Sequence, residues 1–249
     1  AAPAEVRMTE TEYDDGNISI VLTVYREFDT DIYAADVRLS SADFLKTALA
    51  GNTYGRNVKA KTSEIAEANG AILAINGDYY GARSAGYVIR NGVLYRSTGS
   101  RGAEALVIYD DGSFEIVNES DVGAEELLNA GARHVLSFGP GLLQDGEIIV
   151  SERDEVGRAM VSNPRTAIGI IDDLHYVFVV SDGRTRASAG LTLHELALFM
   201  ERLGAATAYN LDGGGSSAMV FNGRIVNNPT TDGRAIRERS VSDIVFIGY

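Results

Sequence analysis

Arg165-Thr-Ala-Ile-Gly-Ile-Ile171 is an apolar run of strand length, and after Asp172-Asp173 a second run follows it, Leu174-His-Tyr-Val-Phe-Val-Val180. Both runs are rich in β-branched residues, and the acidic pair between them is typical of a turn. The pattern predicts a β-hairpin. Its open end would bring Arg165 and Asp182 to the same edge of a sheet.

A helix is predicted to follow this hairpin. Apolar side chains recur at helical spacing, and a glycine ends the pattern: Leu193, Leu196, Ala197, Met200, Leu203 and Gly204. Thr192 and Glu195 have the spacing of a capping box, in which each side chain accepts a hydrogen bond from the other's backbone N–H. A capping role for Glu195 is structural, and the spacing leaves a catalytic role for the same carboxylate open.

A glycine-rich loop, Asn210-Leu-Asp-Gly-Gly-Gly-Ser-Ser217, lies beyond the helix between two apolar stretches that predict short strands, 205–210 and 217–221. Glycine lets the backbone approach another group closely, and a run of N–H donors can form an anion-binding concavity. The loop therefore predicts a site with Asp212 at its mouth. The alternative is a tight connection in which the glycines only avoid strain.

The N-terminal half reads mainly as strands. Residues 17–40 alternate apolar and polar side chains, as a hairpin or meander does, and 71–76 form an unbroken apolar run that predicts a buried strand. Ser41 and Thr62 are candidate caps of two short helices. The buried strand ends in Asn76-Gly-Asp-Tyr-Tyr80, which is either part of a site or an ordinary turn with its tyrosines on the rim of the core.

The fold class that follows is α+β: a mixed, largely antiparallel β-sheet core with a few flanking helices in a single domain. Paired turn signals along 86–114 predict further hairpins, and short helical and strand patterns occupy 123–130 and 134–138. With 249 residues, 45% of them hydrophobic, the chain is long enough for one domain with a substantial core.

Composition restricts the partners. The net charge of −13 argues against binding to nucleic acid or to an anionic membrane surface, since both need an electropositive footprint. There is no cysteine, and no apolar run approaches the roughly 18 to 20 residues that span a bilayer, so no membrane insertion is expected. The start, Ala1-Ala-Pro-Ala-Glu-Val6, resembles what remains after removal of a signal peptide, which suggests export.

A set of motifs gives the chain a family resemblance, and they stand in this order: Asn76-Gly-Asp-Tyr-Tyr80, Phe138-Gly-Pro-Gly-Leu-Leu143, Arg165-Thr-Ala-Ile-Gly169, Asp182-Gly-Arg184, Leu193-His-Glu-Leu-Ala197, Leu203-Gly204, Asn210-Leu-Asp-Gly-Gly-Gly-Ser216 and Arg239-Ser-Val-Ser-Asp243. In this respect the chain resembles the phosphodiester glycosidase domain family over roughly residues 60–249. The resemblance implies that 61–249 form the domain core, completed by N-terminal strands and a helix from 1–60. The chain lacks the cysteines and further modules of the animal member, which points to a secreted or cell-envelope bacterial relative.

The reaction implied by this resemblance is hydrolysis of the bond between a sugar's anomeric carbon and a phosphodiester oxygen, with an N-acetylglucosamine-like sugar. The substrate would be a small-molecule or cell-wall glycan phosphodiester. The candidate catalytic residues are Asp212, Glu195 and Asp182, with Asp212 or Glu195 as base or nucleophile. The candidate substrate-binding residues are Asn76, Asp78, Arg165, Thr166, Arg184, Gly213, Gly214, Gly215, Ser216 and Arg239. Arg165 and the loop amides would hold phosphate, and Asp78 and Asp182 would hold sugar hydroxyls.

Two other classes of function remain open at this point. One is a non-catalytic envelope module that binds a phosphorylated glycan. The other is a metal-dependent phosphodiesterase in which Asp78, Asp182 and Asp212 are ligands of a hard cation. The three histidines have no metal-binding spacing, which argues against a transition-metal site. We therefore expect no metal-binding residues and no required cofactor. Binding of Ca²⁺ by the carboxylates is left open.

Overall fold

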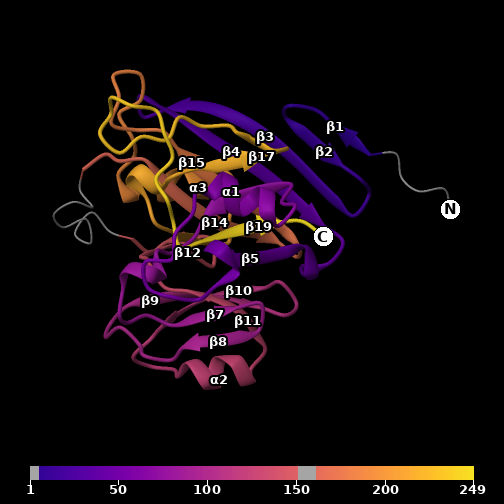
Figure 1. Ribbon diagram of the computed structural model, residues 1–249, viewed down its shortest axis with the longest axis vertical. Coiled ribbons are helices and arrows are strands. Elements are labelled where there is room, and N and C mark those ends of the chain that lie inside the picture. Colours follow the sequence, from indigo (N-terminus) through magenta and orange to yellow (C-terminus); the bar gives the residue numbers. More distant parts are fainter. Residues whose placement is uncertain (1–5, 151–160) are drawn as a thin grey trace.

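The computed structural model describes residues 6–150 and 161–249, and their strands form three sheets (Figure 1). The nine-stranded sheet has the order β1 (Arg7–Met8), β2 (Glu12–Asp14), β3 (Ile18–Glu27), β4 (Thr30–Leu39), β15 (His175–Ser181), β14 (Arg165–Asp172), β16 (Thr207–Asn210), β12 (Gly141–Gln144) and β13 (Glu147–Ile148). One five-stranded sheet has the order β10 (Phe114–Asn118), β9 (Glu104–Tyr109), β11 (Ala132–Leu136), β7 (Val88–Arg90) and β8 (Val93–Arg96). The other has the order β18 (Arg224–Ile225), β17 (Met219–Phe221), β6 (Leu73–Asn76), β19 (Asp243–Ile247) and β5 (Leu45–Leu49).

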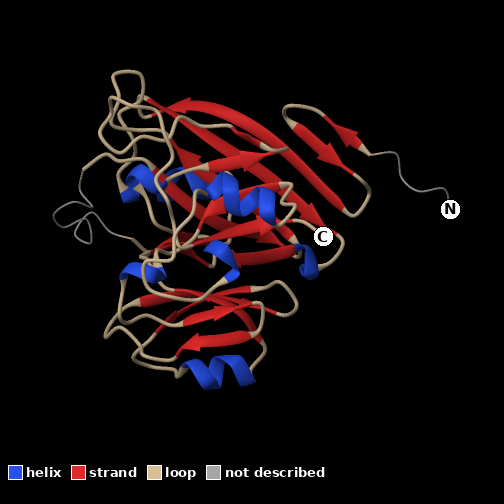
Figure 2. Cartoon of the chain, in the orientation of Figure 1, coloured by secondary structure: helices blue, strands red, loops and turns tan. Residues whose placement is uncertain are grey.

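Three α-helices cover these sheets in the described ranges (Figure 2). They are α1 (Thr62–Ala68), α2 (Ala124–Asn129) and α3 (Leu193–Arg202). Helix α1 packs on β6, β17 and β19, α2 packs on β8 and β11, and α3 packs on β12, β13, β14 and β16. Each sheet therefore has a helix on one face, and the other faces are available for a shared core.

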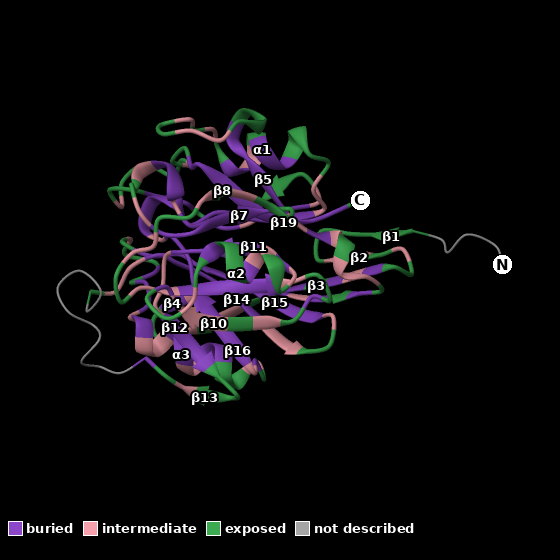
Figure 3. Ribbon diagram, turned by 90° about the horizontal axis from the view of Figure 1, so that it is seen from below, coloured by how far each residue is buried: buried purple, intermediate pink, exposed green. Residues whose placement is uncertain are grey.

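The central strand β15 is buried along its whole length. Tyr176, Phe178 and Val180 belong to the core cluster that joins all three sheets, whereas Val177 and Val179 belong to the cluster under α3. Burial on both faces explains why this strand is an unbroken apolar run. Figure 3 shows the contrast between these buried central strands and the N-terminal strands, of which β1 is exposed and β2 is only partly buried.

Most of the predicted elements are confirmed. The hairpin of β14 and β15 is present with Arg165 opposite Ser181, and Thr192 and Glu195 form the predicted capping box of α3. The helix predicted after Ser41 is wrong, because Ser41 caps only a single 3-10 turn before the chain enters β5. Helix α1 is capped one residue earlier than predicted, at Lys61.

The predicted fold class is confirmed: the described strands pair in antiparallel fashion and share one core. The N-terminal strands are part of this unit, since β4 pairs with β15 and β5 pairs with β19. None of the helices in 6–150 and 161–249 is long and apolar enough to cross a membrane.

Candidate active site

An open pocket of about 590 Å³ lies where the end of β16 meets the start of β14 and the start of α3. The residues that line it are Phe138, Gly139, Pro140, Val161, Asn163, Arg165, Arg184, Leu193, Asn210, Leu211, Asp212, Gly213, Gly214 and Arg239. The lining brings together one carboxylate and three arginines from separate parts of the sequence. In a chain of net charge −13, this is the local basic cluster that an anionic ligand requires.

The backbone of Asp212 is fixed by hydrogen bonds to the end of β6 and the residue that follows it. Its N–H donates to Gly77 O at 3.2 Å, and its carbonyl accepts from Asn76 Nδ2 at 2.6 Å. The residue is only 7% exposed, and Oδ1 accepts from the Gly213 N–H at 2.9 Å. Oδ2 has no hydrogen bond of good geometry among the described residues and lies 3.7 Å from Arg239 Nη2. The carboxylate is thus fixed, and its second oxygen is buried without a hydrogen bond of good geometry.

The protonation of Asp212 is set by opposing influences. Burial raises the pKa of its carboxyl above the ordinary aspartate value, while the Ser216 hydroxyl, Arg239, the Gly213 amide and Arg83 pull the pKa down. Burial has the larger effect. Asp212 is therefore more basic than an exposed aspartate.

Arg239 connects this carboxylate to the glycine loop. Its Nε and Nη2 donate to Ser216 Oγ at 3.1 and 2.7 Å, and Nη2 also donates to Gly213 O at 3.3 Å. Ser216 thereby positions the guanidinium beside Asp212. The structure thus brings together three of the predicted site residues, Asp212, Ser216 and Arg239.

Arg165 and Arg184 approach the pocket from a different side. Arg165 Nε donates to Leu191 O at 2.9 Å, and Arg184 donates from Nε to Asn163 Oδ1 at 3.1 Å and from Nη1 to Thr231 O at 2.8 Å. These contacts hold both guanidinium groups in the pocket wall. Planar guanidinium groups in fixed positions suit recognition of a phosphate group.

The glycine loop does not present the row of free amides that its sequence predicted. Gly213 N donates to Asp212 Oδ1, Gly214 N donates to Pro164 O at 2.8 Å, and Ser216 N donates to Gly213 O at 3.2 Å. Gly214 has a φ of +61°, and a Cβ there would lie 2.9 Å from Arg184 Nη2. The prediction that the loop amides hold phosphate is therefore wrong for Gly213 and Gly214, and the glycines serve close packing. Gly215 lies within the same buried turn.

Asn76 and Thr166 support the loop from the interior. Both are fully buried, and Asn76 Oδ1 accepts from Thr166 Oγ1 at 2.8 Å and from Ala218 N at 3.3 Å. Together with the bond from Asn76 to the Asp212 carbonyl, these contacts fix both ends of the loop. The prediction that the two side chains bind substrate is corrected, because neither reaches the pocket.

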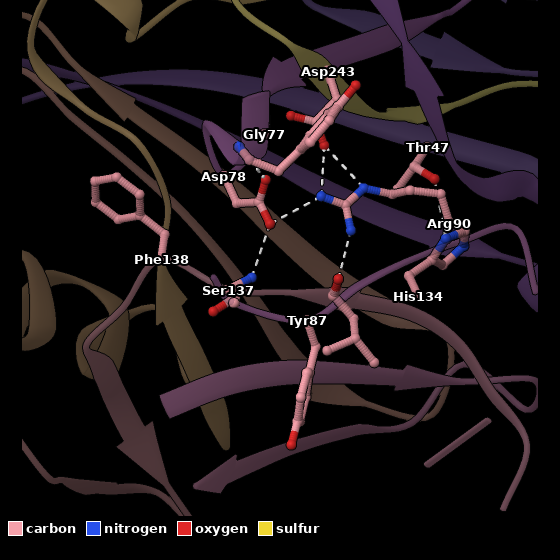
Figure 4. Close-up of polar contacts among 12 residues, drawn as sticks. Thr47, Gly77, Asp78, Tyr87, Arg90, His134, Ser137, Phe138 and Asp243 are labelled. Carbon is pink, nitrogen blue, oxygen red and sulfur yellow. Dashed lines mark hydrogen bonds and ion pairs between the residues drawn. The ribbon is translucent and has the colours of Figure 1, made fainter. Parts of the chain in front are cut away.

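Asp78 has a different role from the predicted one (Figure 4). It is fully buried and pairs with Arg90 Nη2 at 2.9 Å, and Arg90 also pairs with Asp243 at 2.8 Å. The second Asp78 contact, from Ser137 N at 2.8 Å, fixes the chain just before pocket residue Phe138. Asp78 therefore positions the pocket wall, and it is too deeply buried to bind sugar hydroxyls.

The ion cluster of Asp78, Arg90 and Asp243 holds two carboxylates for one guanidinium. Burial raises the pKa of Asp243 to about 7, although Arg90 opposes the rise, and the neighbouring Asp78 adds to it. A Cβ on Gly77 would lie 2.2 Å from Asp243 Oδ1, so only glycine permits this approach. The cluster joins the end of β6, the start of β19 and the segment after β11.

Asp182 is also satisfied by structural partners. Its Oδ1 accepts from Asn228 N at 2.8 Å, its Oδ2 accepts from Asn228 Nδ2 at 2.9 Å, and Tyr33 OH donates to Oδ2 at 3.3 Å. Although β14 and β15 bring Arg165 and Asp182 to one edge, the carboxylate points to the segment after β18. The predicted catalytic and sugar-binding roles of Asp182 do not fit this placement.

A family model described as phosphodiester glycosidase matches residues 69–248. The chain belongs to this family. A Bacillus subtilis (strain 168) relative, the SPbeta prophage-derived uncharacterized protein YomE, is 34% identical over 215 residues, which cover 83% of this chain and 32% of that protein.

A mammalian relative is less similar in sequence. The mouse N-acetylglucosamine-1-phosphodiester alpha-N-acetylglucosaminidase is 28% identical over 189 residues, which cover 69% of this chain and 36% of the mouse protein. The chain thus spans about a third of the length of the curated relatives it matches. Family membership supports a hydrolase.

Solved structures agree on the fold. The catalytic domain of the zebrafish N-acetylglucosamine-1-phosphodiester alpha-N-acetylglucosaminidase, auto-inhibited by its pro-peptide, superposes with a TM-score of 0.75 at 20% identity, covering 100% of this chain and 89% of that one. A hypothetical protein from Synechocystis superposes with a TM-score of 0.72 at 16% identity, covering 99% and 64%. Both show that this fold is shared by sequences of low identity.

A metal cluster is not found in the part of the chain that the structure describes, where no three His, Asp or Glu side chains converge. Asp78, Asp182 and Asp212, the ligands considered for a hard cation, are each held by different partners. The described geometry therefore offers no site built from these three aspartates.

Several residues around the pocket escaped sequence reasoning. Arg90 follows the apolar pair Val88-Ile89 in a short strand, and a charge at the end of a buried strand is the signal that could have found it. Arg83, whose guanidinium lies 4.6 Å from the centre of the Phe138 ring, had no such signal. Asn210 was part of the glycine motif, but nothing local distinguished its side chain.

The contacts of Glu195 indicate a capping role. It accepts from Thr192 N at 2.9 Å, and its own N–H donates to Thr192 Oγ1 at 3.1 Å, which is the capping box. Glu195→Gln retains an oxygen for the Thr192 N–H, so we expect parental kcat and a loss of stability of roughly 0.3–1 kcal/mol from the helix dipole. Steady-state kinetics and thermal melting measure both. A fall in kcat of a hundredfold at unchanged Tm would return Glu195 to the catalytic residues.

Proposed function

We propose that this chain hydrolyses the bond between the anomeric carbon of an N-acetylglucosamine-like sugar and a phosphodiester oxygen, releasing the sugar and a phosphate monoester. The observation that carries the proposal is the buried carboxylate of Asp212, the one acidic side chain among the described residues that line the pocket, beside Arg165, Arg184 and Arg239. Family membership supplies the reaction class. The mouse relative, named for N-acetylglucosamine-1-phosphodiester, suggests the sugar.

The chemistry of the leaving group explains why one carboxylate suffices. A phosphate monoester has a second pKa of about 6, so it departs without a proton from a general acid. The usual pair of glycosidase carboxylates then reduces to one, which faces the anomeric carbon as nucleophile or as the base that activates water. Asp212 takes this role, and its raised pKa makes it the stronger base.

The arginines would stabilise the departing phosphate. Charge builds up on the phosphate oxygens as the C–O bond breaks, and fixed cationic donors that meet this charge lower the barrier. Arg239 is held by Ser216, and Arg184 by Asn163 and the Thr231 carbonyl, so neither needs to reorganise during the reaction. The proposed reaction uses no metal and no cofactor.

The proposed setting is outside the cytoplasm, in the cell envelope or secreted, with a small-molecule or cell-wall glycan phosphodiester as substrate. A structural neighbour from Burkholderia pseudomallei is described as a putative exported protein, with a TM-score of 0.61 at 17% identity. The acidic surface, with net charge −13, suits this setting and gives no support to nucleic-acid or membrane partners.

The position of bond cleavage tests the proposal. Hydrolysis of a sugar-1-phosphodiester in ¹⁸O-water should place the label in the sugar and leave the phosphate monoester unlabelled, because water attacks carbon. Mass spectrometry reads the result under conditions in which the free sugar does not exchange its anomeric oxygen. We expect turnover to be unaffected by EDTA.

Other outcomes distinguish the alternatives. Label in the phosphate, or loss of turnover on chelation that Mg²⁺ or Mn²⁺ restores, identifies a metal-dependent phosphodiesterase. Binding without product identifies a glycan-binding module. A Ca²⁺ requirement with the label still in the sugar changes only the cofactor.

A further inference from the structure

Two buried oxygens in the pocket wall lack hydrogen-bond partners among the described residues: Asp212 Oδ2 and Asn210 Oδ1. Buried polar side-chain atoms are nearly always paired, so each exception needs an explanation. Unpaired atoms also occur away from the pocket, such as Thr62 Oγ1 and Ser242 Oγ, but only Asn210 and Asp212 among the described cases line it. Asp212 Oδ2 is explained by the proposed reaction, and Asn210 Oδ1 is not.

The orientation of Asn210 is fixed by its neighbours. Its Nδ2 donates to Gly139 O at 2.8 Å, its backbone N–H donates to Pro140 O at 3.2 Å, and its carbonyl accepts from Gly139 N at 3.2 Å. The Gly139 carbonyl oxygen can only accept a hydrogen bond, so the Asn210 side-chain atom that faces it is the Nδ2 donor. The unpaired end of the Asn210 amide is therefore Oδ1. With 2% of the residue exposed, this acceptor has little freedom to find another partner.

The spacing from Asp212 indicates which substrate atom meets this acceptor. Asn210 ends β16 and Asp212 lies two residues further on, so their Cα atoms are at most about 7 Å apart. If Asp212 faces the anomeric carbon, a group near that carbon must lie beside Asn210. The anomeric carbon has two ring neighbours: the ring oxygen, which carries no hydrogen, and carbon 2, which bears an N–H or O–H.

We propose that Asn210 Oδ1 accepts a hydrogen bond from the donor on carbon 2 of the sugar, an acetamido N–H or a hydroxyl. The inference rests on the proposed function and adds a specificity-determining residue to it. A sugar without a donor at carbon 2 leaves Oδ1 unpaired in a site from which the substrate has excluded water. Such a sugar is rejected because the lost hydrogen bond is not replaced.

The test compares two glucose-1-phosphodiesters that differ only at carbon 2, one with a hydroxyl and one with fluorine. Fluorine is similar in size but cannot donate. Fluorine also slows C–O cleavage intrinsically. The quantity to compare is therefore the kcat/KM for the hydroxyl substrate divided by the kcat/KM for the fluoro substrate, measured in wild type and in Asn210→Ala. The intrinsic effect is the same in both proteins and cancels in this comparison. We expect this ratio to be larger in wild type by about tenfold, as for one hydrogen bond in a dry site.

Asn163→Ala is the matched control. Asn163 also lines the pocket, but its Oδ1 already accepts from Arg184 Nε at 3.1 Å. Asn163→Ala should lower kcat/KM for the hydroxyl and the fluoro substrate by the same factor, so the ratio of the two kcat/KM values stays at the wild-type value. Equal ratios in wild type and Asn210→Ala, with turnover retained, overturn this inference alone. Absence of turnover with every sugar phosphodiester removes the proposed function, and this inference with it.

A binding measurement needs no variant. In calorimetric titration of the wild-type protein, glucose 1-phosphate should bind about tenfold more tightly than 2-deoxy-2-fluoroglucose 1-phosphate. This result supports the assignment even if Asn210→Ala does not fold. Equal affinities overturn it.

Discussion

Asp212→Asn is expected to lower kcat by about 10²–10⁴-fold, the range for removal of a catalytic base, while the protein stays folded. Asparagine has the same shape and keeps an oxygen for the Gly213 N–H. It also removes a buried charge, so Tm should be unchanged or higher. Steady-state kinetics and thermal melting together separate this outcome from a structural defect.

The pH profile gives an independent reading of the same carboxylate. The reaction requires Asp212 to be ionised, and burial raises its pKa above the ordinary value of about 3.9. The acid limb of kcat/KM should therefore lie at a higher pH than an exposed aspartate gives. Because Arg239 opposes the rise, Arg239→Gln should move the acid limb to still higher pH.

Two results would remove Asp212 from the mechanism. One is wild-type kcat in the Asn variant. The other is an acid limb that Arg239→Gln leaves in place, since a carboxylate 3.7 Å from the guanidinium must sense the loss of that charge. If Asp212→Asn instead loses activity together with a large fall in Tm, Asp212 is a structural residue.

The fold could be predicted where burial leaves a pattern in consecutive residues. β14 and β15 carry unbroken apolar runs because β15 is covered on both faces, and the capping box of α3 involves residues only three positions apart. β5 was missed because Ser41 does cap a turn, and only the distant pairing with β19 makes the following residues a strand. A sequence pattern therefore predicts an element reliably when the residues that stabilise the element lie close together in the sequence.

The site was harder to predict, because residues of the same chemical type have different roles. Asp78, Asp182 and Asp212 all follow strands, yet of these three aspartates only Asp212 lines the pocket. What distinguishes Asp78 is Arg90, and what distinguishes Asp182 is Asn228. Each is a partner that sequence spacing does not reveal. In the glycine loop, the Gly213 and Gly214 N–H groups are likewise bonded to protein acceptors.

Arg90→Met is expected to destabilise the protein by about 3–5 kcal/mol, because it leaves the Asp78 and Asp243 carboxylates buried without a counter-charge. For a domain of this size the change lowers Tm by roughly 6–20 °C. Activity should fall as well, since the cluster joins β6 and β19 where Gly77 O accepts the Asp212 N–H. Replacing both aspartates by asparagine in the same variant should restore most of the loss, because no buried charge then remains.

The pH dependence of unfolding tests the same cluster in the wild type. The pKa of Asp243 is raised to about 7 in the folded state, so the native protein binds this proton more tightly than the unfolded chain does. The stability from Asp243 is therefore fully present below about pH 4 and is lost as pH rises through about 7. Asp243→Asn should remove that part of the pH dependence. If Arg90→Met melts like the wild type, or if Asp243→Asn leaves the pH dependence intact, the cluster is not what fixes the strand ends behind Asp212.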